Sequence, residues 1–274
     1  MSRSVSRAAS GSSPTVRPPP GRPDGAQPPQ RSSRLPTAGR LLVGTSGFAY
    51  RDWAPRFYPA GIIDRELLHA YAERLPACEL NNTFYRSPTS AAIDGWLAAT
   101  PATFRFAVKA QRGGSLRALA VDPESSVPWL TNPLRRFGQR LGTVLFRVPQ
   151  DVERDDARLA ALLACWPPDL SLTLEFQHPS WHVDETFAAL AAVGAVLCAT
   201  DLDELAEPPT IRRTGGFLYL RLRRTAYDDA ALTGWAARIE PFLAAGDDAF
   251  VFFRHDADGE SALRAMRLAA SLGG

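Results

Sequence analysis

Seven charged residues stand at or near the ends of short apolar segments, where together they could bind and transform an anionic molecule. Successive side chains of a strand alternate between two faces, so in segment 170–176 Leu172 and Leu174 share one face while Thr173 and Glu175 share the other. In a barrel one face meets the covering helices and the other points inside. Applied to each segment, this alternation predicts an inward ring of Glu79, Lys109, Arg147, Glu175, Asp201, Arg221 and Arg223.

This ring has the residue types for acid–base or metal chemistry on a small anionic substrate. Glu79 and Glu175 could act as base, acid or metal ligand, with Asp201 and His178 in support. Cations beside them would hold an anionic group such as phosphate, and Lys109 is also a candidate Schiff-base nucleophile. The predicted catalytic residues are Glu79, Lys109, Glu175 and Asp201, and the predicted substrate-binding residues are Asn81, Tyr85, Arg147, His178, Trp181, Arg221 and Arg223.

Two alternatives accompany this interpretation. The same charges could form an interior salt-bridge network that only stabilises the barrel, because buried charges must be paired. A divalent metal is a possible cofactor, but His178 and His182 do not form a zinc-protease motif, since Pro179 disfavours the helix that would align them. The candidate metal ligands are Glu79, Glu175, His178 and Asp201.

The elements that must position these residues follow the pattern of repeated βα units. Eight strands in about 235 residues match the usual size of a (β/α)8 barrel, the TIM-type fold. An open doubly wound sheet is the alternative, but no G-x-G-x-x-G sequence follows the first strand. The predicted strands are 41–45, 77–81, 103–109, 143–148, 170–176, 195–201, 217–223 and 249–255.

Apolar residues at helical spacing fill most of the intervening segments. One stripe contains Leu67, Leu68, Tyr71 and Leu75 behind an expected N-cap at Asp64. Another helix is expected to begin with a cap at Asp184 and to stop at Gly194. Pro208 and Pro209 leave no room for a good helix in 202–215, so the sixth crossover should be short or irregular.

The first 39 residues differ from the rest in composition. They carry six Arg and one Asp, a charge of +5, which leaves 25 basic and 28 acidic residues after position 39, a net of −3. This tail is rich in Pro, Ser and Gly and is predicted to be disordered, with a transit peptide or a nucleic-acid-tethering arm as alternatives. The barrel segment 40–274 is therefore not a globally basic nucleic-acid binder.

Cysteine usage and hydropathy indicate a cytoplasmic protein. Cys78, Cys165 and Cys198 are odd in number and lie in apolar surroundings, which suits buried thiols in a reducing compartment. No run of about 18 apolar residues is present, so membrane spanning is not expected.

Six short segments form a distinctive set of motifs along the chain. They are GTSGFAYRDW at 44–53, FYP at 57–59, ELNNTFYR at 79–86, FRFAVK at 104–109, EFQHPSW at 175–181 and YLRL at 219–222. These motifs resemble the YecE-like family, also described as the domain of unknown function 72 (DUF72). The resemblance extends over 40–274 and implies a TIM-type barrel without implying a particular reaction.

The sequence also departs from that family's usual pattern at several strand ends. Gln111-Arg112 replace a Thr-His pair, Gln177 replaces an Arg, and Arg223-Arg224 replace a His-Gly pair. Added Arg at 147, 223 and 254 indicates either a more anionic ligand or the loss of an ancestral activity. The function expected from these residues is a hydrolase, lyase or isomerase acting on a phosphorylated or sugar-containing substrate. The alternative is a non-catalytic barrel that binds nucleic acid or a metabolite.

Overall fold

The computed structural model describes residues 38–273, and these form a closed barrel of eight parallel strands in chain order. The strands are β1 (Leu41–Ser46), β2 (Ala77–Leu80), β3 (Arg105–Lys109), β4 (Leu141–Val148), β5 (Leu172–Phe176), β6 (Val196–Asp201), β7 (Phe217–Leu222) and β8 (Asp248–Phe253). Their order confirms the predicted TIM-type fold, and β8 closes the ring by pairing with β1 from Leu41↔Ala249 to Thr45↔Phe253. The tail predicted to be disordered comprises residues 1–39, of which 1–37 lie outside the described residues.

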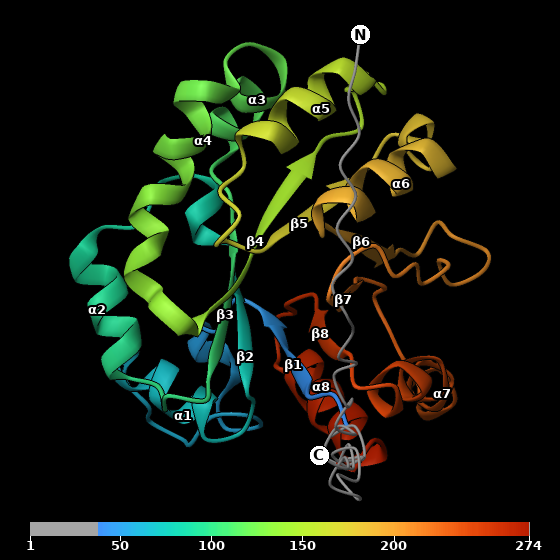
Figure 1. Ribbon diagram of the computed structural model, residues 1–274. Coiled ribbons are helices and arrows are strands. Elements are labelled where there is room, and N and C mark those ends of the chain that lie inside the picture. The colour runs from blue at the N-terminus through green and yellow to red at the C-terminus, as the bar shows by residue number, and fades with distance from the viewer. Residues whose placement is uncertain (1–37, 274) are drawn as a thin grey trace, which may run out of the picture. The chain divides into compact units, whose positions relative to one another are not determined.

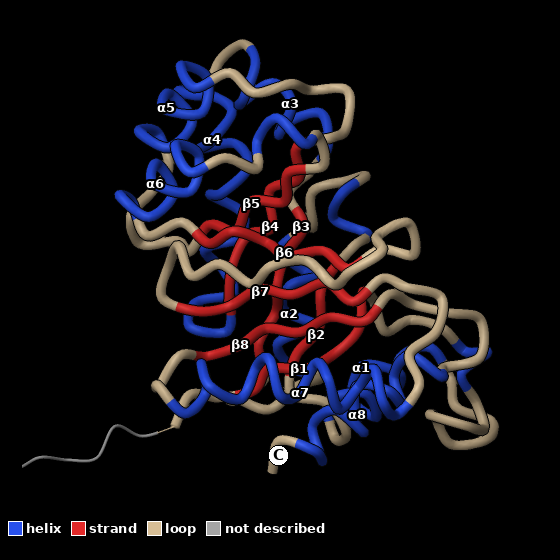
Figure 2. The backbone as a smooth tube through the Cα atoms, turned by 90° about the vertical axis from the view of Figure 1, so that its right-hand side faces the viewer, coloured by secondary structure: helices blue, strands red, loops and turns tan. Residues whose placement is uncertain are grey.

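Helices surround the strands on the outside of the barrel (Figure 1). In Figure 2, α3 to α6 lie on one side of the strands and α1, α7 and α8 on the other. The helices are α1 (Leu67–Ala72), α2 (Ser90–Ala98), α3 (Arg112–Ala120), α4 (Pro123–Thr131), α5 (Asp156–Cys165), α6 (Asp184–Val193), α7 (Asp229–Ala244) and α8 (Glu260–Ser271). Within residues 38–273, no helix is long and apolar enough to cross a membrane.

The segments that connect successive strands differ in length and in secondary structure. Two helices, α3 and α4, and a 3-10 segment (Asn132–Arg140) join β3 to β4. Between β6 and β7 the described segment 202–216 contains no helix and runs as an extended loop (Figure 1). The prediction of an irregular sixth crossover is confirmed, and the cause is the proline pair, which removes backbone donors and restricts the preceding residue.

The residues at the helix ends agree with only some of the sequence predictions. Gly194 adopts φ 71° at the end of α6, the left-handed conformation expected of a C-terminal glycine. The predicted caps at Asp64 and Asp184 are wrong: each is the first residue of its helical segment, and neither N-terminus has a side-chain cap. Both carboxylates instead stand in the first turn, where the helix dipole favours a negative charge.

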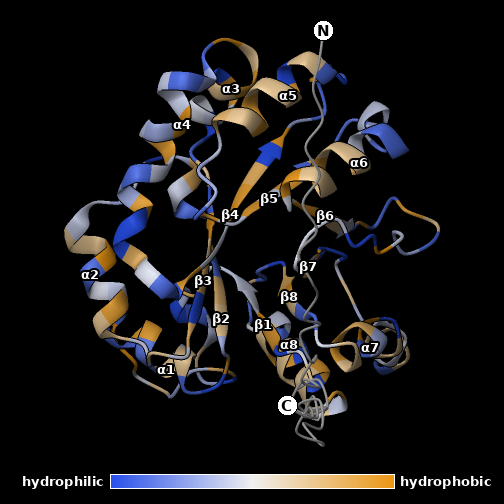
Figure 3. Cartoon of the chain, viewed as in Figure 1, coloured by the Kyte–Doolittle hydropathy of each residue, from blue (hydrophilic) through white to orange (hydrophobic). Residues whose placement is uncertain are grey.

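Two apolar layers hold the barrel together. The outer faces of the strands pack against the helices, and the inner faces form a separate cluster inside the barrel. In Figure 3, β4 is hydrophobic along most of its length and hydrophilic towards its C-terminal end. The polar end of β4 is thus the end that leads into the following crossover. The inner apolar cluster consists of Leu42, Ala77, Ala107, Leu145, Val196, Cys198, Tyr219, Phe250 and Phe252.

Candidate functional site

Arg221 of β7 links two carboxylates at the C-terminal end of the barrel. Its Nε and Nη2 donate to the Glu79 carboxylate at 3.0 and 2.7 Å, and its Nη1 donates to the Glu175 carboxylate at 2.7 and 2.9 Å. All three side chains are at most 3% exposed. Each nitrogen of Arg221 is thus bonded to a carboxylate, so this predicted substrate-binding residue lies at the centre of an internal ion network.

Three hydroxyl groups complete the network. Ser46 donates to Glu79 at 2.7 Å, the Tyr219 hydroxyl donates to Glu79 at 2.8 Å, and Thr200 donates to Glu175 at 2.9 Å. Burial alone would raise the pKa of Glu175, but the attraction of Arg221 overrides it and lowers that pKa to about 2. The pKa of Glu79 is lowered by the same balance, burial opposed by Arg221 and then by Ser46. Both carboxylates are therefore ionised hydrogen-bond acceptors rather than proton carriers near neutral pH.

Lys109, at the end of β3, lies beside this network. Its side chain is 7% exposed, and its Nζ stands 4.2 Å from the centre of the Phe84 ring, a cation–π contact. Within residues 38–273 this ammonium makes no hydrogen bond or ion pair. Burial and the neighbouring Arg221 lower the pKa of Lys109 to about 8, although Glu79 and Glu175 oppose the change. Lys109 is thus a buried amine that exchanges its proton in the physiological range.

Arg147 and Arg223 add two further positive charges. Arg147 donates to Gln177 at 2.7 Å, while its Nε lies 3.7 Å from Glu175 and has no hydrogen-bond partner among the described residues. Burial, and then repulsion from Arg221, lower the pKa of Arg223. The Arg223 side chain has no ion-pair partner within residues 38–273. With Lys109 and Arg221, the site holds four cations against two carboxylates, an excess of two positive charges.

Three predicted substrate contacts border this group. Asn81 precedes a 3-10 turn (Asn82–Phe84), and its buried Oδ1 has no partner in the described part of the chain. Tyr85 is 80% exposed and packs its edge on Phe84. His178 accepts a hydrogen bond from the backbone N–H of Ser180 and therefore caps a short turn. Asn81 and Tyr85 remain candidates for ligand contact, whereas His178 has a structural partner.

Trp181, also predicted to bind substrate, is a packing residue. It is fully buried, stacks on Phe176 with ring centres 4.6 Å apart, and donates its Nε1 proton to the Val152 carbonyl at 2.8 Å. A ligand has no access to this ring. Trp181 follows β5 closely along the chain, and the loop between them folds back so that its ring stacks on Phe176. The spacing of residues in the sequence does not show this contact.

Asp201 does not face the barrel interior, and its predicted orientation is wrong. In β6 it pairs with Leu222, a member of the outer apolar cluster, and it accepts hydrogen bonds from Arg224 at 2.8 Å and Tyr227 at 2.9 Å. Its neighbour Thr200 points inside and bonds to Glu175 instead. Both faces of β6 are apolar, as expected of a strand buried on both sides, so alternation of polarity does not identify the inner face.

The candidate metal ligands are consequently dispersed. Glu79 and Glu175 are bound to Arg221, His178 caps its own turn, and Asp201 lies on the other face of the sheet. Within residues 38–273, no three His, Cys, Asp or Glu side chains come together in a way that could hold a metal ion. The donor set does not fit the divalent metal that the sequence left possible.

Comparison with known proteins places this barrel in a family. The family model described as "Protein of unknown function DUF72" matches residues 42–274. The chain belongs to the DUF72 family. It is 23% identical to the UPF0759 protein YunF of Bacillus subtilis, over 81% of this chain and 91% of that protein. This confirms the family membership predicted from the motifs.

Two solved structures share the fold of this DUF72 protein. A DUF72 family protein from Thermotoga maritima has a TM-score of 0.75 and 24% identity, covering 86% of this chain and all of that one. Another, from Enterococcus faecalis, has a TM-score of 0.69 and 17% identity, covering 87% of this chain and 99% of that one. At this level of identity the similarity supports the fold alone.

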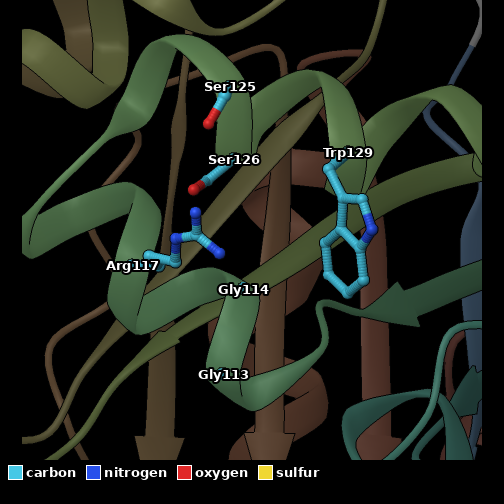
Figure 4. Close-up of a pocket in the computed structure, with 6 residues that line it drawn as sticks. All are labelled: Gly113, Gly114, Arg117, Ser125, Ser126 and Trp129. Atoms are coloured by element: carbon cyan, nitrogen blue, oxygen red, sulfur yellow. The ribbon is translucent and has the colours of Figure 1, made fainter.

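One departure from the family pattern has a structural explanation in this DUF72 protein. Gln111 caps α3, its Oε1 accepting the backbone N–H of Gly114 at 2.7 Å. Gly113 and Gly114 then line a separate pocket of about 280 Å³ between α3 and α4, with the Trp129 ring on one side and the Arg117 guanidinium directed towards two serines (Figure 4). The altered loop therefore serves helix packing.

The sequence analysis did not select Ser46, Thr200 or Phe84. Ser46 and Thr200 are small hydroxyl residues at strand ends, and their role becomes evident only when the carboxylates opposite them are placed. Phe84 lies in a turn after β2, so strand alternation has no bearing on it. Its proximity to Lys109 is a tertiary contact between the turn after β2 and the end of β3.

Proposed function

We propose that the C-terminal end of the barrel binds a small anionic substrate, such as a phosphorylated or carboxylated metabolite, and that this DUF72 protein is an enzyme acting on it. The observation that carries the proposal is the excess of positive charge: both carboxylates of the site are already bound to Arg221. The remaining cations are Lys109, Arg147 and Arg223. Within residues 38–273, Lys109 and Arg223 have no ion-pair partner, and Arg147 has only a long contact of 3.7 Å with Glu175, which Arg221 already binds. Such cations are stabilised by an anion, and barrel enzymes bind their substrates at this end.

The available acid–base group supports lyase or isomerase chemistry. Lys109 has a pKa of about 8, close to the value at which a group both accepts and donates protons efficiently near neutral pH. Glu79 and Glu175 are held ionised, so they would position Lys109 and Arg221 and stabilise positive charge rather than transfer protons. Proton abstraction next to a carbonyl group requires a base and a positive charge that stabilises the enolate oxygen, roles that Lys109 and the neighbouring arginines would fill.

Anion binding is tested by calorimetric titration of the protein with inorganic phosphate, pyrophosphate and citrate. We expect at least one of these anions to bind, and Arg147→Gln and Arg223→Gln each to weaken binding about tenfold or more, since a charge-assisted hydrogen bond contributes about 1.5–3 kcal/mol. Arg135→Gln is the matched control, because Arg135 pairs with Asp169 at the opposite end of the barrel. Equal affinity in all three variants, or no binding in the wild type, would contradict the proposal.

Turnover separates an enzyme from a binding protein. A panel of sugar phosphates and keto acids is incubated with the wild type and with Lys109→Arg, and product formation is followed by mass spectrometry. Turnover lost in Lys109→Arg with anion affinity retained is the expected result. Binding without turnover across the panel would favour the non-catalytic alternative. Nucleic acid is the less favoured ligand, because residues 40–274 carry a net charge of −3.

A further inference from the structure

Lys109 is the only lysine of the chain, in which Arg supplies every other basic side chain. An arginine would serve equally well or better to clamp an anion, because its planar fork binds phosphate and carboxylate in a bidentate manner. Arg cannot lose its proton near neutral pH, whereas a buried lysine can. The one position with an amine is therefore the position where a neutral, nucleophilic nitrogen becomes available.

Three features leave this nitrogen free of a hydrogen-bonding partner among the described residues. The Lys109 side chain is buried, its Nζ rests against the face of Phe84, and no carboxylate of residues 38–273 lies within ion-pair distance of it. The carboxylates that would otherwise compete for Nζ are engaged by Arg221, which binds both of them. Glu79 and Glu175 still act on the charge of Lys109 through space, but within residues 38–273 neither carboxylate forms an ion pair with its Nζ.

We propose that Lys109 forms a covalent imine with the carbonyl carbon of a small anionic aldehyde or keto acid. This inference rests on the proposed function, because Arg147 and Arg223 would hold the carboxylate or phosphate of that substrate. The neutral Nζ attacks the carbonyl carbon, the carbon–oxygen π bond breaks, and one proton of the attacking nitrogen passes through solvent to the oxygen, which gives a neutral carbinolamine. The hydroxyl of the carbinolamine takes up one further proton from solvent and leaves as water, and the nitrogen lone pair forms the carbon–nitrogen double bond of a protonated imine. No oxidant or reductant is required.

The electrostatics of the site suit each stage. The protonated imine carries the same single positive charge as the lysine ammonium, so Glu79 and Glu175 compensate both species equally from their fixed positions. The cation–π contact with Phe84 is also available to both. The pKa of about 8 gives a usable fraction of neutral amine near neutral pH, roughly one tenth at pH 7.

The test is reductive trapping with glyoxylate, which is the smallest anionic aldehyde. The full chain is incubated with glyoxylate and cyanoborohydride, digested, and searched by mass spectrometry for carboxymethyl-lysine at Lys109. Since the amino terminus is the only other amine, peptide mapping assigns the adduct without ambiguity. Acetaldehyde is the neutral comparison, and Lys109→Arg and Arg135→Gln are the control variants.

We expect trapping at Lys109 with glyoxylate to be faster than at the amino terminus, slowed by added phosphate, and about tenfold slower in Arg147→Gln and Arg223→Gln. Glyoxylate trapping should fall severalfold more than acetaldehyde trapping in those two variants, because acetaldehyde has no anionic group for the arginines to hold, whereas any change in the Lys109 amine affects both aldehydes alike. Anion binding measured by calorimetry together with an unmodified Lys109 would overturn the imine and leave the proposed function standing. Absence of anion binding would overturn the proposed function itself. If Lys109 is trapped at a rate that neither phosphate nor the two Arg variants change, the anionic substrate class would be overturned.

Discussion

Replacement of Arg221 by Met should reveal how much the ion network contributes to the stability of the fold. The variant leaves Glu79 and Glu175 buried without their common partner, at 0% and 2% exposure. Breaking a buried pair by removing one partner costs about 3–5 kcal/mol. The pKa of Glu175 leads to a similar value: a decrease from about 4.3 to about 2 corresponds to about 3 kcal/mol. At neutral pH the unfolding midpoint should therefore fall by about 6–20 °C, given 2–4 °C per kcal/mol for a domain of this size.

The loss of stability caused by Arg221→Met should become smaller as the pH falls. In the wild type the pKa of Glu175 is depressed in the folded state, so its contribution is fully present above about pH 5 and is lost as the pH falls towards 2. In Arg221→Met only burial remains, and burial raises the pKa of both carboxyl groups. Acidification then neutralises them and relieves the penalty. The stability gap between wild type and variant should narrow between pH 7 and pH 4.

The assay is thermal and urea unfolding followed by tryptophan fluorescence at pH 7, 5.5 and 4. Arg135→Gln is the control, since its exposed ion pair with Asp169 should contribute less than about 1 kcal/mol at every pH. The triple variant that adds Glu79→Gln and Glu175→Gln to Arg221→Met should recover a large part of the lost stability, because no buried charge is left unpaired. A gap that is absent at pH 7, or that widens on acidification, would refute this account of the network.

Three further perturbations test other parts of the structure. Gly114→Ala places a methyl group 2.6 Å from the Trp129 ring and should lower the free energy of urea unfolding by about 1–3 kcal/mol. Gly113→Ala is the control: its nearest neighbour is at 3.4 Å, so it should lower that free energy by less than about 1 kcal/mol. Asp201→Asn weakens the buried hydrogen bonds to Arg224 and Tyr227, so it should lower stability by about 1–3 kcal/mol and leave phosphate affinity unchanged. A loss of phosphate affinity above threefold would show that Asp201 is wrongly placed outside the site. Acylation of Lys109, followed by mass spectrometry, should have its pH midpoint near 8, and a midpoint above pH 10 would contradict the buried environment of that amine.

The sequence by itself determined the number and order of the strands. Apolar runs separated by helical stripes predict eight βα units, and such units can pack only as a parallel sheet with helices outside. Proline chemistry predicted the irregular sixth crossover, and alternation predicted the inward orientation of Lys109, Glu175 and Arg221. These features depend on residues close together in the chain, so local pattern is sufficient to predict them.

Only the tertiary structure decided how the charges are paired. Arg221 is 142 residues from Glu79 and 46 from Glu175, and the three side chains meet because barrel closure brings β2, β5 and β7 to the same level. The predicted inward orientation of Asp201 was wrong for a related reason, since β6 is apolar on both faces and alternation of polarity does not identify its inner face. An ion pair depends on distances of a few ångströms across the barrel, and no regularity along the chain encodes them. For this reason the sequence predicted a ring of charges, and only the fold shows that Arg221 binds both carboxylates while, within residues 38–273, Lys109 and Arg223 have no ion-pair partner.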